Sequence, residues 1–235
     1  MTPENVKQGL QVIQDRFHSI LDSSASHVLS DARQQLAKYK LKKGKPVEWS
    51  LDIPPVRPLR FRKSVLDHLN IQVDLSCALR WRDGLTAQNV LLRIWSFDSD
   101  VCYRDAVDSD LIRERLPSPP SRVIARFHFD KANAKQEGPT FHLQYGGKAE
   151  DDELFWHPEA FAWPRFLHHP IDLVLACELV AANFYIDDYR RISKEPTWVG
   201  VMRCAQQSLL DDYYTKCRRA LSAKTSLTDD LWNRN

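Results

Sequence analysis

The clearest pattern in the chain is a regular alternation of apolar and polar residues over residues 68–82. Because successive side chains of a strand point to opposite faces, this segment predicts a half-buried strand. The Asp83-Gly84 pair predicts a turn, and the apolar residues 90–95 predict a second, central strand. We therefore expect an antiparallel hairpin in the middle of a sheet.

Two further strands are expected at residues 122–130 and 140–146, where the same alternation returns on both sides of a loop. A slip of one residue would expose the phenylalanines of these strands, so their division into two faces is well determined. The simplest antiparallel register pairs Asp130 with Thr140, His128 with His142, and Arg126 with Gln144. In that register one face is apolar, and the other carries Arg126, His128, Asp130, His142 and Gln144.

Helical spacing of apolar residues appears at both ends of the chain. An amphipathic helix is expected from Thr2, its N-cap, to about Leu21, and a second from about Ser30 to Leu41. Residues 171–185 are apolar nearly all round, which predicts a buried helix, and a last helix is expected over residues 197–220.

These elements predict an α+β fold with an antiparallel sheet of about four strands, within residues 68–146, packed on one face by the N- and C-terminal helices. Residues 1–43 would form a helical appendage and residues 68–235 the core, with one domain expected overall. Between them, residues 44–67 form a basic connector in which four prolines disfavour helix and central strand. Residues 47–53 could still form an edge strand.

Composition excludes several classes of protein. Of 235 residues, 43% are hydrophobic and 27% charged, which is ordinary for a globular chain. The five cysteines are widely spaced and lack zinc-binding spacing, which favours free thiols in a reducing compartment. Because no signal peptide or membrane-spanning apolar run is visible, we expect a cytoplasmic protein with no membrane partner.

Charge is concentrated in residues 38–63, which carry +7, while the rest of the chain carries −5. Such a basic segment is either ordinary solvated surface or a binding site for nucleic acid. Aromatic residues at positions 39, 49 and 61 lie among the basic residues and could stack on unpaired bases. The candidate nucleic-acid contacts are Lys40, Lys42, Lys43, Arg57, Arg60, Arg62 and Lys63.

The polar face of the strands at 122–130 and 140–146 has two interpretations. It could be the solvated side of a sheet, or a site, since neither strand places Lys or Glu on it. As a site, His128 and His142 could be the general acid and base on a phosphodiester, with Arg126 on the developing charge. Alternatively, the two histidines and Asp130 could bind a divalent metal ion, the only cofactor that this sequence suggests.

Two functions are compatible with these patterns. The first is a non-catalytic interaction subunit that binds a protein partner through helices 1–43 and the aromatic loop 155–167, and nucleic acid through segment 38–63. The second is a phosphodiesterase or nuclease that uses the polar face around His128 and His142. We favour the first, because no catalytic motif such as Gly-x-Ser-x-Gly or His-Glu-x-x-His is present.

Overall fold

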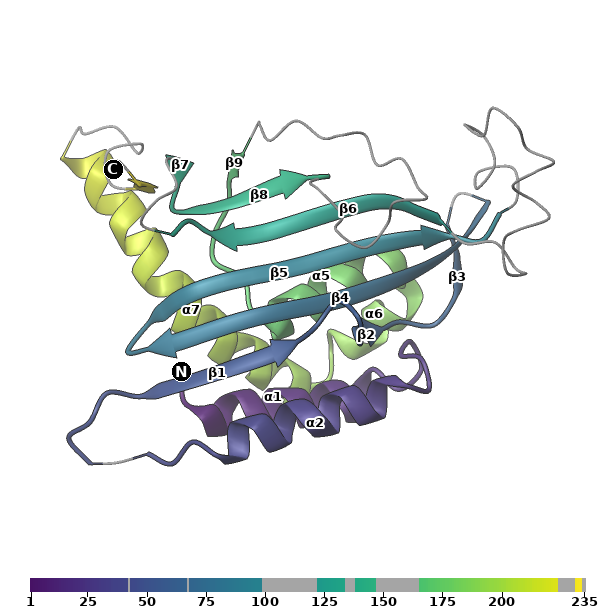
Figure 1. The fold of residues 1–235 in the computed structure, drawn as a ribbon, viewed down its shortest axis with the longest axis horizontal. Coiled ribbons are helices and arrows are strands. Elements are labelled where there is room, and N and C mark those ends of the chain that lie inside the picture. Colours follow the sequence, from purple (N-terminus) through teal and green to yellow (C-terminus); the bar gives the residue numbers. More distant parts are fainter. Residues whose placement is uncertain are drawn as a thin grey trace.

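In the computed structural model, a long antiparallel hairpin crosses the middle of an eight-stranded sheet (Figure 1). The structure describes residues 1–41, 43–66, 68–98, 122–133, 138–146, 165–223 and 231–233. The hairpin strands are β4 (Leu69–Arg82) and β5 (Leu85–Ser96), as the alternation predicted. However, the centre of β4 is buried on both faces, because Gln72, Asp74 and Ser76 are buried as well as the apolar residues between them. The prediction of a half-buried strand was wrong there.

The proline-rich segment contributes three strands to the sheet. They are β1 (Glu48–Ile53), β2 (Leu59–Arg60) and β3 (Ser64–Leu66), and each pairs antiparallel with β4. The prolines between β1 and β2 lie outside the strands, so no ladder hydrogen bond is lost. The expected edge strand at 47–53 is confirmed as β1, and these three strands account for most of the excess over the four strands predicted.

The other half of the sheet contains β6 (Arg122–Lys131), β8 (Phe141–Tyr145) and β9 (Phe166–Leu167). The register differs by two residues from the prediction, because His128 pairs with Gln144 and Asp130 with His142. The predicted partner of Asp130, Thr140, instead donates its amide to the Leu231 carbonyl. There the C-terminal β10 (Trp232–Asn233) pairs with β7 (Gly138–Pro139). An even shift leaves the two faces as predicted.

In the described ranges, five helices lie on one side of this sheet, with α1 and α2 side by side and α5 and α7 behind the strands (Figure 1). Their bounds are α1 (Pro3–Arg16), α2 (Ala25–Ala37), α5 (Leu173–Phe184), α6 (Ile186–Ile192) and α7 (Pro196–Ser222). The α+β class and the helices from both chain ends are confirmed. The first helix ends earlier than predicted and the second begins earlier, while Thr2 caps α1 as expected.

The N-terminal helices share one hydrophobic core with the sheet. Leu10, Ile13 and Leu29 are fully buried in this core, and the Phe17 ring centre lies 4.6 Å from that of Trp198 on α7. The apolar faces of α1 and α2 are therefore buried within the chain. No described helix has the length and apolar character needed to cross a bilayer.

Candidate functional site

The strand register places the predicted polar residues in rows on the face opposite the helices. One row runs across the sheet from Arg60 through Asp74 and Arg93 to Arg126. The next row contains Ser76, Leu91, His128 and Gln144, and the third contains Ala78, Asn89, Asp130 and His142. All five predicted site residues lie on this face, as the alternation required.

Part of this polar face is buried, while Arg126, His128, Asp130 and Gln144 on it are half-buried. Ser76, Leu91 and His142 are only 3%, 4% and 2% exposed. A solvated sheet face, one of the two interpretations of the sequence, does not describe these positions. Buried polar groups are normally hydrogen-bonded. Yet His128 Nε2 and Asp130 Oδ1 are buried and have no hydrogen-bond partner among the residues that the structure describes.

Burial changes the protonation of these two side chains. Burial, together with the smaller effect of the nearby Arg126 guanidinium, lowers the pKa of His128 to about 4. Burial raises the pKa of Asp130 to about 6, partly offset by the positive charge of Arg165. At neutral pH His128 is therefore an uncharged imidazole, which can accept a proton but is a poor general acid.

The two histidines do not form the cross-strand pair that the acid–base hypothesis assumed. His142 lies opposite Asp130, and its Nδ1 is 3.1 Å from the Pro139 carbonyl oxygen. Its ring is thereby held against the preceding strand, β7. Over the described ranges, no group of three or more His, Cys, Asp or Glu side chains is arranged to hold a metal ion. The three proposed metal ligands, His128, Asp130 and His142, do not form such a site.

The arginines of the basic segment form contacts within the protein. Arg57 pairs with Asp31 at 2.8 Å and Arg62 with Asp188 at 3.0 Å. Lys63 Nζ lies 3.8 Å from the centre of the Phe97 ring. Each partner lies outside the segment in sequence, so the local charge count could not reveal that these cations are already engaged.

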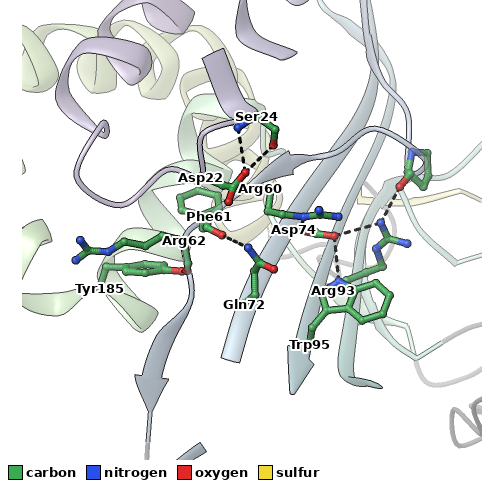
Figure 2. Close-up of polar contacts among 11 residues, drawn as sticks. Asp22, Ser24, Arg60, Phe61, Arg62, Gln72, Asp74, Arg93, Trp95 and Tyr185 are labelled. Atoms are coloured by element: carbon green, nitrogen blue, oxygen red, sulfur yellow. Dashed lines mark hydrogen bonds and ion pairs between the residues drawn. The ribbon is translucent and has the colours of Figure 1, made fainter. Parts of the chain in front are cut away.

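Arg60 belongs to a buried cluster around Asp74 (Figure 2). The Asp74 carboxylate is 1% exposed and accepts hydrogen bonds from Arg60 Nε and Trp95 Nε1, each at 3.0 Å. Arg93 lies 3.5 Å from the same carboxylate and donates to the Pro55 carbonyl at 2.7 Å. The cluster thereby ties β2 and the preceding proline turn to the centre of the sheet. No sequence motif marks Asp74 as its centre.

The described lysines in the first part of the basic segment, before Pro46, have no such contacts with other described residues. We call residues 38–45, which join the end of α2 to the approach of β1, the lysine loop; the α2–β1 connection projects from the body of the protein (Figure 1). Lys42 lies outside the described residues. The other four lysines of this loop are exposed and form no ion pair with any described residue. Lys38, Lys40 and Lys45 line a groove of about 420 Å³, together with Tyr39 and Pro3.

Two of the three aromatic residues expected to stack on bases are buried. Trp49 stacks on Trp81 within the core, with ring centres 5.8 Å apart, and Phe61 stacks on Tyr185 at the same distance. Only Tyr39 remains at a groove, where its hydroxyl is 2.6 Å from Ser50 Oγ.

The described end of the aromatic loop 155–167 lies at the edge of the sheet. Residues 155–164 are outside the described part of the chain. Phe166 and Leu167 form β9 and are 55% and 46% exposed, and Tyr145 on the neighbouring β8 is 46% exposed. Since Phe166 pairs with Leu143, two positions from Tyr145, Phe166 and Tyr145 lie on one face of the sheet, and Leu167, opposite His142, lies on the other. Exposed apolar side chains therefore flank this edge on both faces, and we call these three residues the apolar edge.

Comparison with known proteins adds no assignment. No protein family, curated protein or solved structure matches this chain. The site must therefore be interpreted from its own chemistry.

Proposed function

We propose that the protein is a non-catalytic binding module whose lysine loop binds single-stranded nucleic acid. The observation that carries this proposal is the group of exposed lysines around a groove that contains Tyr39, none of which forms an ion pair within the described part of the chain. The loop contains five lysines and no acidic residue. Neutralisation of phosphates by such cations releases counterions and supplies most of the affinity of non-specific binding.

Tyr39 adds a second contact of the kind that single strands favour. Its ring lines the groove between lysines, and the hydrogen bond with Ser50 holds the ring in place before a ligand arrives. Stacking of a base on an aromatic side chain contributes about 1–3 kcal/mol. A flexible strand could therefore place a base on Tyr39 while the flanking phosphates meet Lys38 and Lys40.

The test is fluorescence anisotropy with a labelled oligo(dT) over a range of salt concentrations. For Lys40→Gln/Lys43→Gln we expect weaker binding and a salt slope reduced by about 1.4, which is about 0.7 for each lost phosphate contact. The control, Lys7→Gln/Lys194→Gln, removes the same charge elsewhere and should keep the wild-type slope. Equal loss in both variants, or no binding by the wild type at low salt, would refute the proposal.

A matched pair of variants tests the stacking contact. Tyr39→Phe keeps the ring and should retain most of the affinity, whereas Tyr39→Leu should lose about 1–3 kcal/mol of binding free energy. Equal affinities of the two variants would show that no base stacks there.

We further propose that a protein partner binds at the apolar edge formed by Tyr145, Phe166 and Leu167. Exposed apolar side chains at a sheet edge are typical of sites that pair with another chain. Because α1 and α2 bury their apolar faces, the N-terminal helices offer a partner only their polar sides.

This second proposal is tested by purification of tagged protein from its host. A stoichiometric partner should accompany the wild type and Leu221→Asp, a control at another exposed apolar residue. The same partner should be absent with Phe166→Asp/Leu167→Asp. Recovery of the partner with all three proteins, or with none, would contradict the assignment.

A further inference from the structure

A separate cavity of about 350 Å³ lies at the end of the sheet, where the β4–β5 turn and the end of β6 meet α7. Its apolar wall includes Trp81, Leu85, Phe141 and Leu209. Its volume lies at the lower end of the range typical of small-molecule sites. It shares no residue with the lysine loop, so it is independent of the proposed nucleic-acid site.

Lys131, at the end of β6, supplies a positive charge to this cavity. The side chain is half-buried, and its Nζ donates to the Leu85 carbonyl oxygen and lies 5.6 Å from the centre of the Phe141 ring. Among the described residues, no carboxylate lies within ion-pair distance of this ammonium group. Burial lowers the pKa of Lys131, and the nearby Lys216 lowers it further.

The two acidic residues that line the cavity, Asp83 and Asp212, already have other partners, and that of Asp212 is Lys216, which also lines the cavity. Asp212 pairs with Lys216 at 2.7 Å, and Asp83 accepts a hydrogen bond from the Val47 amide at 2.8 Å. A partly buried cation is costly unless it is paired. The anion that would balance Lys131 is therefore best supplied by a ligand.

We propose that this cavity binds a small organic carboxylate with an apolar body, whose carboxylate contacts Lys131. The apolar body would lie between Leu85, Phe141 and Leu209, the side chains that line the wall beside the ammonium group. Thr140 and Ser208 also line the cavity and add hydroxyl groups that could hydrogen-bond to the carboxylate.

The experiment uses 4-fluorobenzoate and its uncharged counterpart 4-fluorobenzamide, followed by ¹⁹F NMR line broadening on the full chain. We expect the benzoate to bind at least tenfold more tightly than the amide. Lys131→Met should abolish this difference and Lys131→Arg should retain it, while the exposed control Lys194→Met should behave as wild type. Ser208→Trp, which fills the cavity from α7, should abolish binding of both probes.

Several outcomes would overturn the proposal. Equal affinity of the two probes would show that Lys131 does not select an anion. Full binding by Ser208→Trp would place the probe outside the cavity. Inorganic phosphate that competes as strongly as the benzoate would show that the apolar wall contributes nothing. Thermal unfolding of each variant establishes that it is folded before the probes are added.

Discussion

A substitution of Asp74 tests whether Arg60, an arginine of the basic segment 38–63, stabilises the fold rather than binding nucleic acid. Asp74→Ala removes the acceptor shared by Arg60, Arg93 and Trp95 (Figure 2). The Arg93 side chain is only 15% exposed, so its guanidinium would lose the buried carboxylate that balances its charge. Removal of one partner from a buried ion pair typically costs about 3–5 kcal/mol, and we expect a loss of that size in the free energy of unfolding.

Arg60 contributes less to the same cluster. Its side chain is 42% exposed, so solvent screens the pair and Arg60→Ala should cost only about 1 kcal/mol. Asp74→Asn keeps one acceptor oxygen, so its loss of unfolding free energy should lie between those of Asp74→Ala and Arg60→Ala. Urea unfolding, followed by tryptophan fluorescence and far-UV circular dichroism, measures each value, and the double variant gives the coupling between the two residues.

Two results would refute this reasoning. If the free energy of unfolding of Asp74→Ala lay within about 1 kcal/mol of the wild-type value, the cluster would not hold β2 on the sheet. If Arg60→Ala lost oligo(dT) binding without any change in stability, Arg60 would be a nucleic-acid contact after all. The arginine and lysine parts of the segment would then act together.

Three further predictions concern Asp172, two helix glycines and the two histidines of the polar face. Burial raises the pKa of Asp172 from 3.8 to about 6. Above pH 6 the buried carboxylate is ionised and lowers the free energy of unfolding by about 3 kcal/mol. Below pH 4 the carboxyl is protonated in both the folded and the unfolded state, and this penalty disappears. Asp172→Asn, which keeps the α5 cap, should therefore be more stable than wild type in urea unfolding at pH 7.5 but not at pH 3.5. The same stability difference at both pH values would contradict this prediction. Gly9→Ala would place its Cβ 3.0 Å from a valine methyl of α5 and should lower stability by about 1–3 kcal/mol. A Cβ at Gly200 meets no neighbouring side chain within 4 Å, so Gly200→Ala should raise stability by up to about 1 kcal/mol. Thermal melts of both variants provide the comparison. His142→Ala should destabilise the protein more than His128→Ala, because the His142 side chain is almost fully buried and hydrogen-bonded with Pro139, whereas His128 is only half-buried and its Nε2 has no partner among the described residues. Any wild-type cleavage of single-stranded nucleic acid that survives both substitutions would eliminate the phosphodiesterase hypothesis.

Local periodicity was enough to determine the class of fold. Alternation at residues 68–82 and 122–130 marked the long strands and their faces, and helical spacing marked the helices at both ends. These patterns are readable because each reflects which side of one element is buried, a property of neighbouring residues. The polar residues of β6 and β8 could therefore be assigned to one face before their register was known.

The tertiary structure decided which of those polar and charged residues are available to a ligand. Asp31, Asp74 and Asp188, each on another element of the fold, pair with Arg57, Arg60 and Arg62, whereas the lysine loop has no equivalent partner among the described residues. The Thr140–Leu231 hydrogen bond, between residues far apart in the chain, likewise accompanies the shift in the β6–β8 register. Periodicity reports burial within one element, but ion pairs and register depend on which elements meet, and only the folded chain brings those elements together.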